Sequence, residues 1–422
     1  MASACRLSLL LNAVLDSTAQ STDSVNGCKR GDALNWFERI TGFPETDYEE
    51  TQSRLELRGT RLRSKVNRKE HEIGEFVMPT LAELRQEVDA GSGNRGVLKV
   101  SLETGDVRKF LLARENRGAL FQVASQFNML EMTGPSATPE DGVTRYQLDP
   151  TQGPACAVAA GAATIYRNYL VPVDGVQGQR ADRQLDGLSD LGAELSRLLG
   201  KPIPELWGMR NGYALCTSTG LAAIDALLEI AGEPELDEMR SLLRIGLHRN
   251  VQVTEILGAP PHLVSQAFCS ALPVAYSDIP SEAWTRLAQL VLDAAYEATL
   301  LESVLNARRG ASNIVFLTRL GGGAFGNQET WIHAAMARAL ELVKGYALDV
   351  RIVSYNPPSP RLQQLVAEFS STCKEFGQWN TTSSATSTAK PTNWKPYWSA
   401  WATGSAQALT GTPAAKPYSW VT

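Results

Sequence analysis

The chain has 422 residues, of which 43% are hydrophobic and 20% charged, a composition typical of a globular protein with one large or two ordinary domains. Its net charge of −5 and isoelectric point near 5.6 leave no broad basic surface, so no nucleic-acid partner is expected. The six cysteines and four histidines form no CxxC or CxxH pair, which argues against a structural zinc site. No apolar run is as long as a membrane span, so no membrane partner is expected either.

The N-terminal residues 1–31 are Ser-rich and weakly patterned, and we expect them to be weakly ordered. An apolar run at 7–15 follows Arg6, but Asn12 interrupts it and no small-residue cleavage site follows. An amphipathic helix is therefore favoured over a signal peptide. Because the cysteines lie mostly in apolar runs, we expect reduced, buried thiols and a cytoplasmic protein, with secretion or export as the alternative.

Residues 32–112 predict an accessory α+β region. The segment 34–40 has helical spacing, and Thr80 with Glu83 three residues later predicts a capping box at the start of a second helix. Two segments of alternating apolar and polar residues flank Gly105-Asp106 and predict a β-hairpin, at 97–102 and 107–112.

From residue 113 the pattern becomes one of strands alternating with helices, which predicts an α/β domain over 113–368. Short apolar runs predict strands at 119–124, 263–268, 313–318 and 348–354, and longer periodic segments predict helices at 154–169, 281–306 and 329–343. This order predicts crossover connections on a mostly parallel sheet, hence an α/β/α sandwich. A largely helical insertion is expected at about 175–260.

The last segment, 369–422, is rich in Ser, Thr and Pro and has no acidic residue after Glu375, which predicts a disordered tail. Five of the nine tryptophans fall there, so docking of the tail on another surface remains an equal alternative: Trp379, Trp394, Trp398, Trp401 and Trp420.

A glycine-rich run, Gly321 to Asn327, follows the predicted strand 313–318 and precedes a predicted helix. Ligands of parallel sheets lie beyond the carboxyl ends of the strands. Glycines let backbone N–H groups turn toward an anion, and a helix N-terminus favours negative charge. A diphosphate is the ligand that this junction predicts; a tight turn that only requires glycine is the alternative. No Gly-Lys-Ser/Thr follows, so the run is not a P-loop.

The run Gly321-Gly322-Gly323-Ala324-Phe325-Gly326 resembles the diphosphate loop of poly(ADP-ribose) glycohydrolases and related macrodomains. The resemblance extends more weakly over about 118–356, and it implies a macrodomain-like fold and ADP-ribose as the ligand. It places Gly321, Gly322, Gly323, Ala324, Gly326 and Asn327 around the diphosphate and Phe325 against the distal ribose. No cofactor or metal is implied.

Two further segments join this motif set: Phe127-Asn128 and Asp149 to Pro154. With the glycine run they look most like the MavL type of bacterial effector, a divergent macrodomain hydrolase that removes ADP-ribose from ubiquitin. The resemblance gives Phe127, Asn128 and Gly153 ligand-binding roles, with Asn128 bonding the distal ribose. A turn that caps the preceding strand is the alternative for Asn128.

The catalytic carboxyl group is where the sequence departs from the glycohydrolase pattern. That family has Gln-Glu-Glu at the catalytic loop, whereas Gln152 here is followed by no glutamate pair. Asp149 is the nearest carboxylate, and a helix-capping role is an equal alternative for it. The remaining candidates include Glu131, Glu140, Asp141 and Glu329, of which Glu329 is also suited to the first turn of a helix.

The sequence therefore predicts a hydrolase that removes ADP-ribose from a modified protein, with ubiquitin as one candidate carrier. A non-catalytic ADP-ribose reader is the first alternative, favoured by the missing glutamate pair. An unrelated nucleotide- or phosphate-binding protein that shares only the loop is the second.

Overall fold

A computed structural model describes residues 34–256 and 260–379, and for 371–379 only the backbone. The chain divides into two compact units, Met1–Cys373 and Lys374–Thr422. The expectations for residues 1–31, and for most of the tail, lie outside the described residues. Helix α13, Pro360–Trp379, covers the first part of the segment expected to be disordered.

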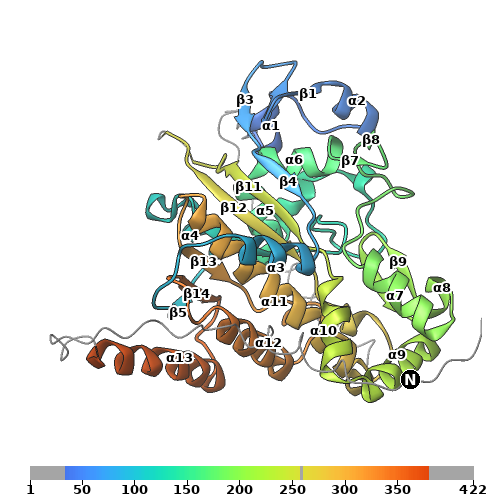
Figure 1. Ribbon diagram of the computed structural model, residues 1–422. Coiled ribbons are helices and arrows are strands. Elements are labelled where there is room, and N and C mark those ends of the chain that lie inside the picture. Colours follow the sequence, from blue (N-terminus) through green and yellow to red (C-terminus); the bar gives the residue numbers. More distant parts are fainter. Residues whose placement is uncertain (1–33, 257–259, 380–422) are drawn as a thin grey trace, which may run out of the picture. The chain divides into compact units, whose positions relative to one another are not determined.

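A seven-stranded sheet forms the centre of the first unit (Figure 1). Its strand order is β4 (Glu75–Val77), β11 (Gly246–Gln252), β12 (Leu263–Cys269), β6 (Leu120–Ala124), β13 (Ile314–Leu317), β14 (Asp349–Ser354) and β5 (Lys99–Thr104). Five neighbouring strands, from β12 to β5, are parallel, and β11 is antiparallel to both β12 and β4. The predicted α/β fold with a mostly parallel sheet is confirmed.

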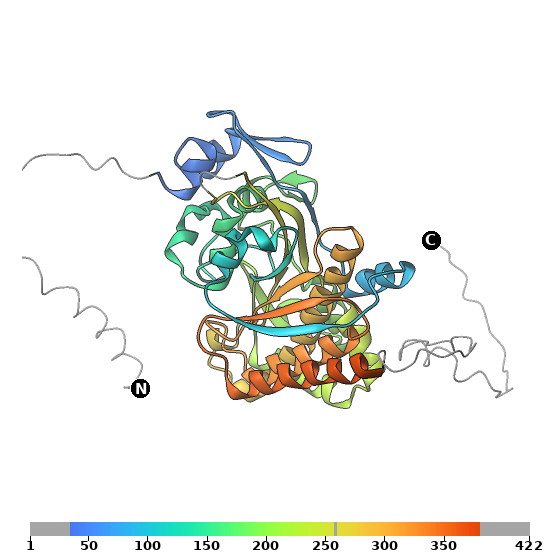
Figure 2. The ribbon, with the colours of Figure 1, turned by 90° about the vertical axis from the view of Figure 1, so that its left-hand side faces the viewer.

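Helices cover both faces of this sheet because the strand side chains alternate between them. On β6, Phe121 and Val123 pack with α4 (Val107–Leu112), α5 (Gln152–Ala159) and α6 (Gly161–Tyr169), whereas Leu120 and Gln122 face the other side. That side carries α3 (Leu81–Ala90), α11 (Thr285–Arg308) and α12 (Glu329–Leu342). Figures 1 and 2 show the green α5–α6 segment and the orange α11–α12 segment separated by the strands.

Helix α11 is buried on almost every side rather than along one stripe, because four other helices pack on it: α3, α12, α9 (Ser218–Ile230) and α10 (Glu233–Ser241). Its buried acidic groups are paired with arginines from those neighbours and from β11. Within the described residues, no helix is both long enough and apolar enough to cross a membrane.

The predicted hairpin at 97–112 is wrong. The first half is β5, but β5 pairs in parallel with β14, which is distant in sequence. The second half is helix α4, because the Asp106 side chain accepts the Arg108 N–H and caps a helix there. The mixture of apolar and polar residues at 107–112 therefore reflects a short helix with one buried face.

The predicted helix at 154–169 is two helices, α5 and α6, that meet at Ala160, whose φ of −109° and ψ of 51° are not helical. Its small side chains do allow close packing, as expected. A Cβ on Gly153 would lie 2.0 Å from the Ala124 carbonyl oxygen, so only glycine lets α5 approach the end of β6 this closely.

The predicted accessory region and insertion both contribute strands to the central sheet. In 32–112, α1 (Trp36–Thr41), α2 (Tyr48–Ser53) and the separate sheet of β1 (Leu55–Arg58), β2 (Arg61–Ser64) and β3 (Glu70–Glu72) pack on α5 and α6, whereas β4 and β5 belong to the central sheet. The segment 175–260 contains helices α7 (Ser189–Leu199), α8 (Ile203–Leu206), α9 and α10. It also holds the hairpin β9 (Trp207–Arg210) and β10 (Tyr213–Cys216), strand β8 (Val176–Gln177), which pairs with β7 (Pro172–Val173), and strand β11. These segments are therefore continuous with the main sheet.

Candidate active site

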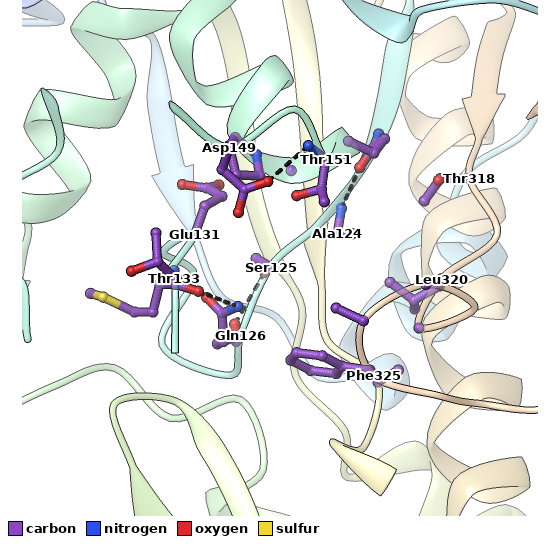
Figure 3. A pocket seen from close by; sticks show the side chains of 18 of the residues that line it. Ala124, Ser125, Gln126, Glu131, Thr133, Asp149, Thr151, Thr318, Leu320 and Phe325 are labelled. Carbon is purple, nitrogen blue, oxygen red and sulfur yellow. Dashed lines mark hydrogen bonds between the residues drawn. The ribbon is translucent and has the colours of Figure 1, made fainter. Parts of the chain in front are cut away.

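One pocket lies at the carboxyl ends of β12, β6 and β13, three adjacent strands of the sheet (Figure 3). Its space is ≈ 790 Å³ when the open solvent at its mouth is counted. Its walls come from the strand ends and from the segments that follow them: 124–126, 131–133, 149–154 and 318–325, with Tyr213, Ala271 and Tyr276. The pocket therefore lies where ligands of parallel sheets usually bind, beyond the carboxyl ends of the strands.

The glycine loop, Gly321 to Asn327, presents backbone donors to the pocket. Within the described residues, the N–H groups of Gly323, Ala324 and Phe325 have no hydrogen-bond acceptor. All three residues line the pocket, and Gly323 and Ala324 are exposed. Unpaired N–H groups on consecutive residues form a concave surface that suits an anion.

The glycine loop is held in shape by bonds on its own far side. The Asn327 N–H donates to the Gly321 carbonyl oxygen at 2.9 Å, and the buried Asn327 side chain donates to the Leu272 carbonyl oxygen at 2.8 Å. Gly321 has a φ of 73°, and a Cβ there would lie 2.4 Å from the Ala271 Cβ. Asn327 and Gly321 therefore fix the backbone whose central amides remain free.

Glu131 is the buried carboxyl group of the pocket. Its side chain is 1% exposed, and its Oε2 has no hydrogen-bond partner among the described residues. Burial raises the pKa of Glu131 to about 7, although the nearby Arg167 acts in the opposite direction. A carboxyl group of this kind holds a proton near neutral pH and can give it up, which general acid catalysis requires.

Glu131 is carried by a tight turn, residues 126–132, which we call the Glu131 turn. The Gln126 side chain spans it: Oε1 accepts the Met132 N–H at 2.6 Å, and Nε2 donates to the Met132 carbonyl oxygen at 3.2 Å. Asn128 shapes its middle, since Oδ1 accepts the Leu130 N–H at 3.1 Å. The turn is therefore fixed by its own polar side chains.

Arg167, fully buried on α6, lies behind Glu131. Its Nη2 is 3.4 Å from Glu131 Oε1, its Nε donates to the Met129 carbonyl oxygen at 3.0 Å, and its Nη1 donates to His248 Nδ1 at 3.3 Å. Burial and the adjacent guanidinium hold the pKa of His248 well below its usual range, so the ring is neutral. Arg167 thus pairs with one oxygen of Glu131 and leaves the other unpaired.

Asp149 and Gln152 lie in the segment that leads into α5. Asp149 lines the pocket, and its Oδ1 accepts the Thr151 N–H at 2.8 Å, which is a turn-forming bond. The Gln152 amide is fully engaged at the end of β6: Oε1 accepts the Ala124 N–H and Nε2 donates to the Gln122 carbonyl oxygen. Figure 3 shows Asp149, Thr151 and Glu131 along the same side of the pocket.

Three aromatic rings close the other side. Phe325 of the glycine loop, Tyr213 of β10 and Tyr276 after β12 have ring centroids 5.1 to 5.6 Å apart. Tyr213 is 1% exposed and its hydroxyl donates to the Met132 carbonyl oxygen, whereas Tyr276 is 37% exposed. Aromatic rings at these separations offer a face for a flat group.

The structure brings together most of the sequence-predicted site residues and leaves others outside. Those that line the pocket are Glu131, Asp149, Gln152, Gly153, Gly321, Gly323, Ala324 and Phe325. Those that do not are Phe127, Asn128, Gly322, Gly326, Asn327 and Glu329. Asn128 is fully buried, and its amide donates to Gln184 Oε1 at 2.8 Å. Glu329 accepts the Ser359 hydroxyl at 2.8 Å and lies 3.5 Å from both Arg319 Nη2 and His333 Nε2.

Several residues that line the pocket were not predicted from the sequence, among them Gln126, Thr318 and Tyr276. Each lies within seven residues of a strand's carboxyl end, as Tyr276 does after Cys269 of β12. Applying the strand-end rule to β12 as well as to β13 would have found Tyr276.

Comparisons with known proteins give little further information. No family model and no curated protein matches the chain. Among solved structures, poly(ADP-ribose) glycohydrolase from Thermomonospora curvata bound to the inhibitor ADP-HPD has 12% identity and a TM-score of 0.35, over 77% of this chain and 97% of the other. The enzyme from Deinococcus radiodurans in complex with ADP-ribose has 15% identity and a TM-score of 0.35, over 71% and 95%. A TM-score of 0.35 is too low to assign a role to any residue here.

Proposed function

We propose that this protein binds ADP-ribose in the pocket and hydrolyses the bond between ADP-ribose and a modified protein. The observation that carries the proposal is that the glycine-loop residues with free N–H groups line the same pocket as Glu131 and Asp149. A diphosphate matches the free amides, and a carboxyl pair matches the chemistry of glycosidic bond cleavage. The resemblance of the loop to the glycohydrolase diphosphate loop supports the choice of ADP-ribose among diphosphates.

Our proposal assigns different roles to the two carboxyl groups. The bond from the anomeric carbon of the distal ribose to the carrier atom breaks, and Glu131 gives its proton to the departing carrier atom. Water adds to the oxocarbenium-like carbon, and Asp149 takes the proton that the water loses. The products are free ADP-ribose and the unmodified carrier.

Burial makes Glu131 the better candidate for the acid. An acid that works near neutral pH needs a pKa near that pH, and burial raises the pKa of Glu131 to about 7. Its Oε2 is unpaired, so the proton it carries is not committed to another protein group among the described residues. Asp149 lies in the segment where the resemblance places the catalytic loop.

Gln152 and Asn128 have supporting roles in this scheme. Gln152 ties the start of α5 to β6, and Asn128 shapes the Glu131 turn. Neither side chain has an amide group left for a substrate. The proposal requires no metal; among the described residues no cluster of three or more His, Cys, Asp or Glu side chains would hold one.

Ubiquitin as the carrier protein, and a cytoplasmic location, are finer parts of the proposal. Ubiquitin is supported by the motif set of Phe127-Asn128, the segment Asp149 to Pro154 and the glycine loop. A reducing compartment is supported by three buried free thiols: Cys156, Cys216 and Cys269.

The testing experiment incubates the protein with ADP-ribosylated carriers, ubiquitin included, and measures released ADP-ribose. Binding is measured in parallel as the melting shift with ADP-ribose, AMP and NAD; a ligand at 100 times its Kd should stabilise the protein by about 2.7 kcal/mol. Release from at least one carrier is the expected result. Binding of ADP-ribose without release from any carrier would identify a reader module, and the absence of both would refute the proposal.

A further inference from the structure

Arg319 is a charged side chain of the pocket to which the proposed mechanism gives no role. Among the described residues that line the pocket, Arg319 is the only basic one, whereas Glu131 and Asp149 are acidic. It follows Thr318 at the end of β13 and precedes the glycine loop by two residues. A dianionic ligand beside two carboxyl groups is stabilised by a cation at short range.

The guanidinium of Arg319 has unused hydrogen-bond donors. Its one ion-pair partner in the described part of the chain is Glu329, with Nη2 3.5 Å from Oε1. Charge-assisted hydrogen bonds are normally 2.7 to 2.9 Å long, so this contact is weak. The Nε–H is buried and has no acceptor among the described residues. The side chain is 37% exposed, which leaves the guanidinium accessible from the pocket.

Glu329 is fixed more firmly than the arginine that it contacts. It is the first residue of α12, where a carboxylate is favoured by the helix dipole, and its Oε1 accepts the Ser359 hydroxyl at 2.8 Å. It does not line the pocket. Glu329 is thus placed to orient Arg319 beside the glycine loop and not to touch a substrate.

We propose that Arg319 binds the diphosphate together with the free amides of the glycine loop, and that Glu329 is the positioning residue that holds Arg319 there. On ligand binding the guanidinium exchanges its long contact with Glu329 for charge-assisted bonds to phosphate oxygens. The pocket consequently selects ligands that carry a diphosphate over a neutral nucleoside with the same base. This inference rests on the proposed function in that ADP-ribose supplies the diphosphate.

Calorimetric titration of the full chain tests the inference with two probes, ADP-ribose and inorganic pyrophosphate. Arg319→Gln removes the charge and should weaken the binding of both by at least about tenfold, since hydrogen bonds to charged groups are among the stronger ones. Arg319→Lys keeps the charge, and its affinity for both probes should lie between those of Arg319→Gln and the wild type. Arg58→Gln is the matched control: Arg58 pairs with Glu56 on β1, outside the pocket, and its loss should leave both affinities unchanged.

Kinetics with an ADP-ribosylated carrier test the role of Glu329. Glu329→Gln should raise KM a few-fold and leave kcat unchanged, because it loosens Arg319 without removing a reacting group. A hundredfold loss of kcat at constant KM would overturn the positioning role and make Glu329 catalytic.

The two proposals fail separately. Unchanged ADP-ribose affinity in a folded Arg319→Gln variant overturns the role of Arg319 and leaves the proposed function standing. Arg319-dependent binding of pyrophosphate without any binding of ADP-ribose refutes the proposed function and supports the arginine. Failure of the wild type to bind either probe overturns both.

Discussion

The glycine loop and the Glu131 turn face the same pocket but offer it different groups. The loop offers backbone N–H groups, two of them on the exposed residues Gly323 and Ala324, which have no side-chain donor. The turn offers a titratable side chain, Glu131, that is almost completely buried and backed by Arg167. The free amides do not titrate, whereas the carboxyl group does so near neutral pH.

This contrast separates recognition from chemistry. Backbone donors bind an anion at any pH but are sensitive to the shape of the side chains around them. The function of a buried carboxyl group depends more on whether it is protonated than on its shape. Changes to the loop should therefore affect affinity, and changes to the Glu131 turn should affect the rate of the chemical step.

Glu131→Gln should have the largest effect. The amide keeps the shape of the side chain but cannot transfer the proton, and such transfer contributes about 10²–10⁴-fold in rate. We expect release of ADP-ribose from a modified protein to slow by roughly 10³-fold while calorimetric affinity for ADP-ribose stays within a few-fold of wild type. A variant that retains more than a tenth of the wild-type rate would exclude Glu131 as the acid.

The pH dependence sharpens the same prediction. The rate should fall as pH rises above about 7, because burial raises the pKa of Glu131 to about 7 and only the protonated form is active. Its ordinary pKa of 4.5 is lower, so the native state binds the proton more tightly than the unfolded state. The free energy of unfolding should therefore decrease as pH rises from about 4.5 to 7, and this decrease should be smaller in Glu131→Gln.

Asp149→Asn should have the next largest effect. Asparagine can still accept the Thr151 N–H, so the turn survives, but it cannot take a proton from water. We expect ADP-ribose binding close to that of wild type and release at least about a hundredfold slower. If release continues at the wild-type rate, Asp149 only caps the turn, and the scheme has to operate with Glu131 alone.

Gly323→Val should affect binding. A Cβ at Gly323 meets no atom within 4 Å, so the variant should fold, but its side chain would occupy the space in front of the free amides. Affinity for ADP-ribose should fall by tenfold or more, roughly 1.4 kcal/mol, as measured by calorimetry. Gly208→Val, on β9 and equally unobstructed, is the matched control and should bind as wild type does. Equal affinities of the two variants would remove the loop from the site.

Deleting residues 376–422 should have the smallest effect. Every residue that lines the pocket lies between 124 and 325, so ADP-ribose affinity should not change. The measurement is calorimetric titration of the shortened chain, with its melting temperature as the control. A large drop in melting temperature would show that the tail contributes to the stability of the first unit.

The local sequence determined the glycine loop and several of the strands and helices around the candidate site. Short apolar runs identified β6, β12 and β13, and the 3.6-residue period identified α11 and α12. The glycine run marked the strand-to-helix junction on which the candidate site is built. The capping box of Thr80 and Glu83 likewise forms where the sequence predicted it. These signals are local because each depends on residues a few positions apart.

Partners distant in sequence decided the rest. Segment 97–112 was predicted to be a hairpin, but β5 pairs with β14, about 250 residues away along the chain, and this pairing leaves 107–112 free to be a helix. Glu131 was one carboxylate among several in the sequence. Burial raises its pKa against the opposing effect of Arg167 of α6, and close packing against Gly153 and Arg167 fixes its place in the pocket. Burial and charge pairing are properties of three-dimensional neighbours, so only the tertiary structure could distinguish Glu131 from Asp149 and Glu329.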